Sequence, residues 1–357
     1  MATTFAVPDG RVAMAATTYT GNGSTQAVSN AVNTVSFQPD LVWVKARNAS
    51  AGNSLYDSIR GVNKLLQSNT TDADNNIPPY GVTAFGSSGF TVGDISTGFY
   101  YCNGASGGAQ SGTPPNYVGW QWKAGGTAVS NTAGTITSQV SANTTAGFSV
   151  VTYTGTGANA TVGHGLGVTP GMVIIKSRSI RNWIVYHSSL TSAAYYLSLN
   201  QTIAQSLVTT IFNSTAPTNA VFNIGTDASV NASAETYVAY CWAPVAGYSA
   251  FGSYTGNGSA DGPFIYTGFR PRYVLIKGSS LISNWNIFDS SRSTYNANDT
   301  VLFADLSNAE SSPATEPIDF LSNGIKIRNA TNAVNSSGNT YIYAFFAENP
   351  LRYANAR

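Results

Sequence analysis

The sequence predicts an all-β fold of three tandem antiparallel β-sandwich repeats, jelly-roll-like in topology. Two observations lead to this prediction. One set of motifs occurs three times in an unchanged order. Between the motifs, short runs of β-branched or aromatic residues alternate with turn residues at intervals of ~8–12 residues, which is typical of sandwiches. Helical periodicity is scarce, so no helical layer is expected.

Each unit opens on a Tyr-Thr-Gly motif and continues into a proline-led apolar run that ends in lysine. The opening motifs are Tyr19–Gly23, Tyr153–Gly157 and Tyr254–Gly258, and the runs are Phe37–Lys45, Val168–Lys176 and Phe269–Lys277. The lysines Lys45, Lys176 and Lys277 are 131 and 101 residues apart. A period of this size is that of a domain and far exceeds the ~20–50 residues of solenoid repeats.

The apolar runs predict buried core strands, because they are short and bounded by proline and polar residues. These strands are expected at Leu41–Lys45, Met172–Lys176 and Tyr273–Lys277. Since proline lacks a backbone donor, it is expected where such strands start, at Pro39, Pro170 and Pro271. A second short alternating strand is expected in each unit at Gly89–Val92, Val221–Ile224 and Gly324–Ile327.

The last strand of each unit alternates in hydrophobicity, so one face is predicted to point inward. The residues of this face are Val118, Trp120 and Trp122, then Val238, Tyr240 and Trp242, then Ile342, Ala344 and Phe346. Cys241 takes the place of Gln121 and Phe345 in this strand, and that variation indicates a packing or surface position.

The chain of 357 residues exceeds the size of a single core, and units of about 100 residues match ordinary domains. We therefore expect an N-terminal attachment arm, a first sandwich, a linker and two further sandwiches. Their bounds are residues 1–16, 17–126, 127–146, 147–246 and 247–357. The linker is inferred from a Thr/Ser/Asn-rich stretch, and a Gly/Ser-rich insertion is inferred at Ser96–Asn116.

The composition argues against several classes of partner. Seventeen Lys and Arg stand against sixteen Asp and Glu, which leaves no basic field for nucleic acid or for an anionic membrane. No apolar stretch approaches a membrane span, and no signal peptide is recognised at the N-terminus, so synthesis in the cytoplasm is expected. The two cysteines, Cys102 and Cys241, lie at non-equivalent positions. Neither a repeated disulfide nor a metal or other cofactor site is predicted.

Lysine recurs with a carboxylate or an imidazole at a nearly constant spacing. The pairs are Lys45 with Asp57, Lys277 with Asp289, and Lys176 with His187. These residue types also serve in acid–base catalysis. The favoured interpretation is a structural pair that ties neighbouring strands, because histidine replaces aspartate in one unit. The sequence Asp72–Asn76 lacks the glycine and glutamate of a calcium loop. No catalytic residue is assigned, and an enzyme is not expected.

Several aromatic residues outside the predicted core strands are candidates for contact with sugars or with other subunits. They are Phe99, Tyr100, Tyr101, Tyr195, Tyr196 and Tyr295. Tyrosine is enriched at interfaces because its ring is apolar and its hydroxyl is polar. Ordinary packing is the alternative for each of them.

These motifs together resemble an uncharacterised repeated domain of tail-fibre and other virion proteins of marine bacteriophages. The resemblance covers nearly everything after about residue 17. It rests on Phe37–Lys45, Leu55–Gly61, Leu66–Thr71, Gly89–Gly93, Tyr117–Gly126, Ala243–Gly258 and the ending Ala347–Arg357.

The resemblance implies a structural phage virion protein, a tail fibre or similar appendage that binds other virion proteins and a host-surface glycan. A capsid decoration or head-fibre protein is the alternative. A polysaccharide-degrading tail spike is the third interpretation, but no carboxylate pair is singled out for that chemistry. A homotrimer located in the virion is expected, because a neutral Tyr-rich surface favours symmetric assembly. Residues 1–16 are expected to grip the particle and to order only on a partner.

Overall fold

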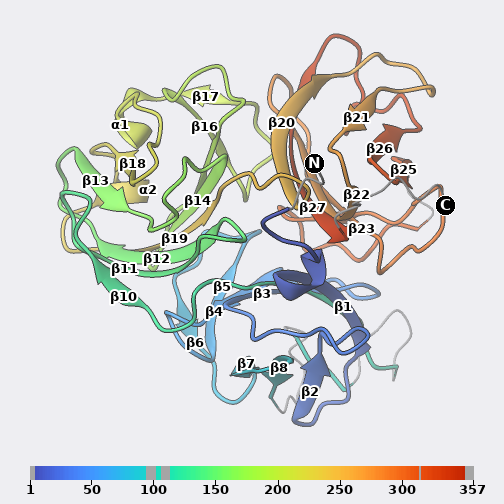
Figure 1. Ribbon diagram of the computed structural model, residues 1–357, viewed down its shortest axis with the longest axis horizontal. Coiled ribbons are helices and arrows are strands. Elements are labelled where there is room, and N and C mark those ends of the chain that lie inside the picture. The colour runs from blue at the N-terminus through green and yellow to red at the C-terminus, as the bar shows by residue number, and fades with distance from the viewer. Residues whose placement is uncertain (1–4, 94–101, 106–112, 313–314, 350–357) are drawn as a thin grey trace.

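The computed structural model describes residues 5–93, 102–105, 113–312 and 315–349. Within them the protein is nearly all β, with several antiparallel sheets and no barrel. The described helices are the short η1 (Gly10–Val12), α1 (Thr209–Phe212) and α2 (Ala228–Asn231), none of which could span a bilayer. Figure 1 shows three lobes arranged as a triangle. Lobe 1 holds β1–β9, lobe 2 holds β10–β19 and lobe 3 holds β20–β27.

Each lobe contains one larger sheet, in which the opening strand, the closing strand and the apolar strand lie side by side. In lobe 1 the order is β1 (Met14–Thr20), β9 (Asn116–Trp122), β3 (Leu41–Ala46), β4 (Ser54–Asp57), β5 (Lys64–Gln67), β6 (Asn75–Asn76). In lobe 2 it is β10 (Val129–Asn131), β11 (Ser138–Asn143), β12 (Phe148–Thr154), β19 (Thr236–Trp242), β14 (Met172–Ser177), β15 (Trp183–His187), β16 (Tyr195–Ser198), β17 (Ser206–Leu207). In lobe 3 it is β20 (Ser249–Thr255), β27 (Thr340–Asn349), β22 (Arg270–Gly278), β23 (Trp285–Asp289), β24 (Leu302–Phe303).

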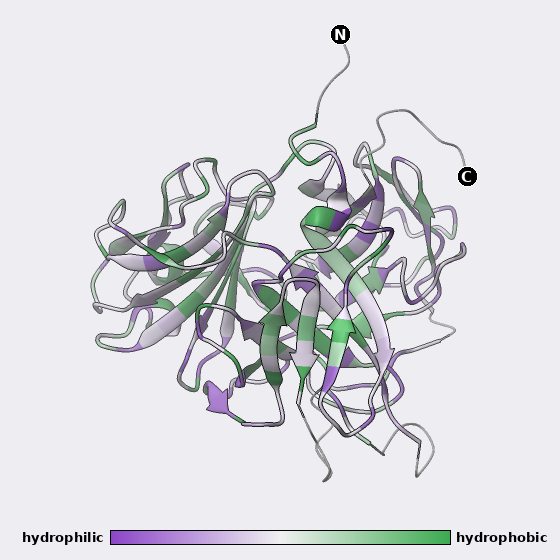
Figure 2. Ribbon diagram, turned by 60° about the horizontal axis from the view of Figure 1, so that its bottom comes forward, coloured by the Kyte–Doolittle hydropathy of each residue, from purple (hydrophilic) through white to green (hydrophobic). Residues whose placement is uncertain are grey.

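A smaller sheet accompanies each larger one. The three orders are β2 (Gln26–Ser29), β8 (Gly89–Val92), β7 (Val82–Gly86); β13 (Ala160–Gly163), β18 (Val221–Ile224); and β21 (Phe264–Tyr266), β26 (Gly324–Ile327), β25 (Ile318–Leu321). In lobe 1, Val28 and Phe90 of the small sheet pack in one cluster with Val42 and Val44 of β3. Hydrophobic residues therefore join the two sheets of this lobe. Figure 2 shows hydrophobic colour along many strands and hydrophilic colour in many loops.

The register of the closing strands is the same in all three lobes. Trp122 lies opposite Met14 and Leu41. Trp242 lies opposite Phe148 and Met172, and Phe346 lies opposite Ser249 and Tyr273. The predicted core strands are therefore present. Pro39 and Pro170 precede theirs by two residues, whereas Pro271 is the second residue of β22, beside a shift in register.

Two segments differ from expectation. The expected linker 127–146 forms β10 and β11, which extend the larger sheet of lobe 2. The expected arm is ordered by the chain itself from residue 5 onward: Phe5 lies against Gly247, and Val7 is only 1 % exposed. Residues 14–16 already belong to β1. The expectation that this segment orders only on a partner is wrong for residues 5–16, because the chain itself buries their apolar side chains in the shared cluster, among them Val7 and Met14.

The closing strands are buried on both faces. The face predicted to point inward joins one hydrophobic cluster that contains residues of all three lobes. In lobe 2 the opposite face, with Tyr237, Ala239 and Cys241, joins a cluster within that lobe. In lobes 1 and 2 the larger sheet thus lies between a cluster of its own lobe and the cluster that all three lobes share, whereas in lobe 3 both faces of the closing strand join the shared cluster.

Candidate functional site

Three aromatic rings meet where the closing strands β9, β19 and β27 converge. The ring centroids of Trp122 and Trp242 are 5.9 Å apart, those of Trp122 and Phe346 are 5.6 Å apart, and those of Trp242 and Phe346 are 6.5 Å apart. All three pairs are edge-to-face, a favourable arrangement for aromatic rings. Because each residue has the same register in its own sheet, each lobe contributes one ring to this aromatic junction (Trp122, Trp242, Phe346).

The three recurrent lysines lie in the interfaces between lobes. Lys45 Nζ donates to Ser307 O of lobe 3 at 2.8 Å, Lys176 Nζ to Thr71 O of lobe 1 at 3.3 Å, and Lys277 Nζ to Thr202 O of lobe 2 at 3.1 Å. Burial lowers the pKa of these lysines, to about 7 for Lys45 and about 8 for the other two. Each lysine therefore fastens its own lobe to a different neighbour.

The residue opposite each lysine crosses the same interface. Trp183 Nε1 donates to Gln67 O, and Trp285 Nε1 donates to Ser198 O, each at 2.9 Å. In lobe 1 an asparagine takes this place: Asn53 Nδ2 donates to Leu306 O at 2.9 Å. The direction of these bonds is the same as for the lysines, from lobe 1 to lobe 3, from lobe 3 to lobe 2, and from lobe 2 to lobe 1.

Asp57, His187 and Asp289 end β4, β15 and β23, and each contacts the next lobe. Asp57 accepts from Tyr240 Oη at 2.8 Å, and Asp289 accepts from Trp120 Nε1 at 3.0 Å. His187 Nε2 donates to Tyr343 O at 3.0 Å. These contacts join lobe 1 to lobe 2, lobe 2 to lobe 3, and lobe 3 to lobe 1.

Arginines neutralise the two buried aspartates. Arg60 Nε lies 2.5 Å from Asp57 Oδ2, and Arg292 Nε lies 2.6 Å from Asp289 Oδ2. Burial alone would raise the pKa of Asp289, but the charge and hydrogen bonds of Arg292 hold it below the usual value. Breaking such a pair is costly because it leaves one charge buried and uncompensated.

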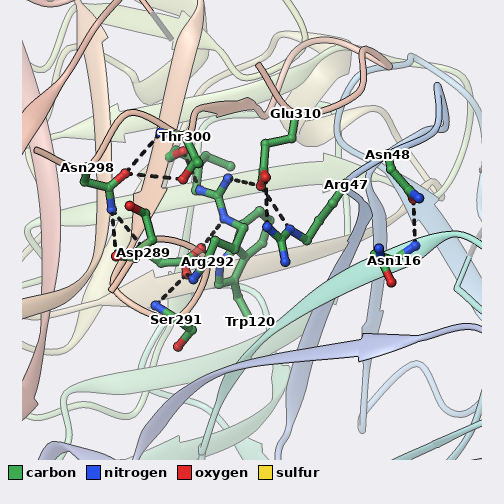
Figure 3. A network of polar contacts seen from close by, with 12 residues as sticks. Arg47, Asn48, Asn116, Trp120, Asp289, Ser291, Arg292, Asn298, Thr300 and Glu310 are labelled. Atoms are coloured by element: carbon green, nitrogen blue, oxygen red, sulfur yellow. Dashed lines mark hydrogen bonds and ion pairs between the residues drawn. The ribbon is translucent and has the colours of Figure 1, made fainter. Parts of the chain in front are cut away.

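The network around Asp289 extends across the interface between lobes 1 and 3, as Figure 3 shows. Arg292 Nη1 lies 2.8 Å from Glu310, and the same carboxylate lies 2.9 Å from Arg47 Nη2 of lobe 1. The guanidinium of Arg292 also lies 5.9 Å from the centre of the Trp120 ring, within the range of a cation–π contact.

The structure does not bring the expected strand-tying pairs together. Asp57 lies opposite Leu41 in the β3–β4 pair, while Lys45 lies four residues further along β3. The lysines bind backbone carbonyls, whereas the aspartates bind arginines. The pairing of these aspartates with arginines could have been predicted from the sequence, because Arg60 follows Asp57 and Arg292 follows Asp289 at the same spacing of three residues.

The aromatic candidates have different environments. Phe99, Tyr100 and Tyr101 lie outside the described residues. Tyr195 and Tyr196 are partly buried in β16 and pack against the shared cluster and the cluster of lobe 2, respectively. Tyr295 is 84 % exposed. The packing alternative fits the two tyrosines of β16.

The described residues were compared with the requirements of a metal site and of a reactive thiol. They contain no group of three His, Cys, Asp or Glu residues that could hold a metal ion. Asp74, in the segment compared with a calcium loop, pairs instead with Arg178 at 2.7 Å. Burial raises the pKa of the Cys102 thiol to about 12 and that of Cys241 further, so both thiols are poor nucleophiles.

Comparisons with known proteins identify the family of the chain. No curated protein and no solved structure matches the chain. A family model described as a domain of unknown function, DUF7483, matches residues 12–350, and the chain belongs to that family.

Proposed function

We propose that each lobe is one β-sandwich and that the three tandem copies close on one another as a trimer within a single chain. Support comes from the shared strand order and from three kinds of contact between lobes. The lysines, the residues opposite them and the strand-end residues Asp57, His187 and Asp289 each occur once per interface. Such a set of equivalent contacts closes a ring, as in cyclic oligomers.

We further propose that the protein is a non-enzymatic structural component of a bacteriophage virion, a tail fibre or similar appendage that contacts a host-surface glycan. The observation that carries this proposal is the closed ring, since its recurrent polar residues join lobes and are not gathered around a substrate site. The assignment to a phage rests on the resemblance of the sequence motifs to those of virion proteins. In this proposal the three lobes of one chain supply the threefold arrangement that was expected of a homotrimer, so that a monomer could bind a partner with threefold symmetry.

The proposal is tested on purified phage particles that encode this chain. Mass spectrometry of the particles should find the chain as a stoichiometric component, and immunogold electron microscopy should place it on the tail. A label on the capsid would support the head-fibre alternative and overturn the tail assignment. Absence of the chain from particles that contain the other virion proteins would overturn the structural role.

The non-enzymatic part of the proposal has its own test. Host polysaccharide incubated with the purified chain should release no reducing sugar above a heat-denatured control. Release that is abolished by changing one carboxylate would establish the degrading tail spike instead.

A further inference from the structure

A polar cleft lies between the first strand of lobe 1 and the region of lobe 3 where β22 starts and β23 ends. Its volume is about 380 Å³, and it is lined by residues 14–18 of β1, the loop 29–32, Arg11, Arg272, Ser290, Ser291, Thr294 and Glu348. The volume falls within the ~300–1,000 Å³ of sites for small molecules. None of the contacts that join the strand-end residues to the next lobe involves Arg272 or Ser290.

The equivalent place in lobe 1 carries its own carboxylate. Ser58 N donates to Asp40 O at 2.9 Å, and Ser290 N donates to Arg272 O at 3.0 Å, so the two pairs correspond. In lobe 1 the Asp40 carboxylate accepts from Ser58 Oγ and from Ala124 N, each at 2.7 Å. The serine hydroxyl at this place is thus satisfied by an oxyanion.

In lobe 3 the oxyanion is missing, because arginine stands where lobe 1 has aspartate. Ser290 is only 6 % exposed, and its Oγ has no hydrogen-bond partner among the described residues. Arg272 Nε is likewise buried and has no such partner. Two adjacent donors therefore lack an acceptor, a state that costs free energy in a buried site.

The charge around the cleft favours an anion. Glu348 lies 3.8 Å from Arg272 Nη1, but it already pairs with Arg270 at 2.5 Å. Arg11 pairs with Asp9 at 2.7 Å. The three arginines Arg11, Arg270 and Arg272 thus pair with only two carboxylates, those of Asp9 and Glu348, which leaves one positive charge in excess among these five residues. Arginine binds carboxylates through directed, charge-assisted hydrogen bonds.

We propose that this cleft binds a carboxylated sugar of the hexuronate class. Its carboxylate takes the place that the Asp40 side chain has in lobe 1 and accepts from Arg272 Nε and Ser290 Oγ. The hydroxyl groups of Thr18 and Thr294, which line the cleft, suit the hydroxyls of a sugar, and the half-exposed Val32 offers an apolar surface to the ring. The inference rests on the proposed function only for identifying this ligand with a host glycan.

The test is calorimetric titration of the purified full chain with glucuronate. Glucuronate should bind at least about tenfold more tightly than glucose, because only the acid supplies the missing acceptor. Equal binding of glucose, or no binding of glucuronate to the folded chain, would overturn the proposal. Acetate that binds as tightly as glucuronate would overturn the sugar assignment, as would a preference for a peptide with a free C-terminal carboxylate. These outcomes leave the location of the chain in the virion unaffected.

Two variants and a control assign the binding to this cleft. Arg272→Gln and Ser290→Ala should each weaken glucuronate binding about tenfold or more. Ser290→Ala should not lower the melting temperature, since the hydroxyl has no hydrogen-bond partner among the described residues and its removal relieves an unsatisfied donor. The control is Arg328→Gln, which removes an arginine that pairs with Asp319 away from the cleft. Loss of binding in the control alone, or unchanged affinity in both cleft variants, would place the ligand elsewhere.

Discussion

The last residue of β4, β15 and β23 is aspartate in two lobes and histidine in the third, and it has the same structural role in all three. The side chain must accept a hydrogen bond from the turn that follows the strand. Asp57 accepts from Arg60 N at 2.8 Å, Asp289 from Arg292 N at 2.9 Å, and His187 Nδ1 from Ser189 N at 3.1 Å. An aspartate brings a buried charge and needs an arginine three residues later. A neutral imidazole does not, and lobe 2 has Leu190 there.

His187 should make stability depend on pH. Its Nε2 donates to Tyr343 O and its Nδ1 accepts from Ser189 N. Protonation of Nδ1 would place its N–H opposite the N–H of Ser189 and would abolish this hydrogen bond. Burial lowers the pKa of His187 from 6.5 to about 4. The unfolded chain therefore binds the proton first, and this group's contribution is present above pH 6.5 and is lost as the pH falls toward 4.

His187→Asn should remove this part of the pH dependence, because the amide oxygen can still accept from Ser189 N and does not titrate. Urea denaturation at pH 7 and at pH 4.5 is the measurement. Between these pH values the wild type should lose about 2–3 kcal/mol more stability than the variant. Equal losses would mean that His187 is not held neutral by its surroundings.

At the scale of the element, local pattern was enough to predict the core strands and the inward alternation of the closing strands. The alternation of hydrophobic residues did not predict that the inward face of each closing strand packs against the other two lobes. Tyr117 and Val118 are both buried, one toward the cluster of lobe 1 and the other toward the cluster shared by all lobes. A strand that is apolar on both faces does not encode which partner covers each face.

The strands β10 and β11 were mistaken for a linker because their sequence is polar. They extend the edge of an existing sheet, because β11 pairs with β12 and β10 pairs with β11 through backbone hydrogen bonds that do not require an apolar sequence. Ser138 is 1 % exposed, yet its hydroxyl is satisfied by Gly163 O at 3.0 Å. The polar composition therefore predicted a loop, although pairing with a neighbouring strand gives this segment a regular β conformation.

The candidate site was predicted in part. The recurrence of lysine, aspartate and histidine identified positions that matter in all three lobes. Their partners could not be predicted, because they lie far away in sequence: Tyr240 is 183 residues from Asp57, and Trp120 is 169 residues from Asp289. The cleft beside Ser290 could not be predicted either, because it forms between lobes 1 and 3 and the sequence does not show that these parts of the chain are neighbours.

The aromatic junction makes the ends of the closing strands sensitive to truncation. Trp122→Ala should lower the free energy of unfolding by about 3–5 kcal/mol, since it opens a cavity between three lobes. Trp122→Phe should cost less, because Trp122 Nε1 has no hydrogen-bond partner among the described residues and a ring remains in place. Chemical denaturation gives both values.

The matched control for the junction is Val129→Ala on β10, where the side chain is 64 % exposed. This change should stay within about 0.5 kcal/mol of the wild type. A Trp122→Ala variant that is as stable as this control would show that the rings do not hold the lobes together.

At the scale of the whole molecule, the lobes share too much buried surface to behave as independent domains joined by linkers. The shared cluster takes Trp120 from lobe 1, Tyr240 from lobe 2 and Tyr273 from lobe 3. Charged residues are only 9 % of the chain, yet several of them lie buried at the interfaces between lobes. Separating the lobes would expose apolar surface and would leave buried ions without partners.

This coupling predicts a single cooperative unfolding transition. In scanning calorimetry, the calorimetric enthalpy should be about equal to the van't Hoff enthalpy, whereas three independent lobes would give a ratio of about three. Trp122→Ala should lower the temperature of the entire transition, because its ring touches rings of both other lobes. If instead the variant shifts one of several resolved transitions, then the lobes unfold separately. A fragment of residues 127–246 should fail to unfold cooperatively, because Trp242 would lose both Trp122 and Phe346.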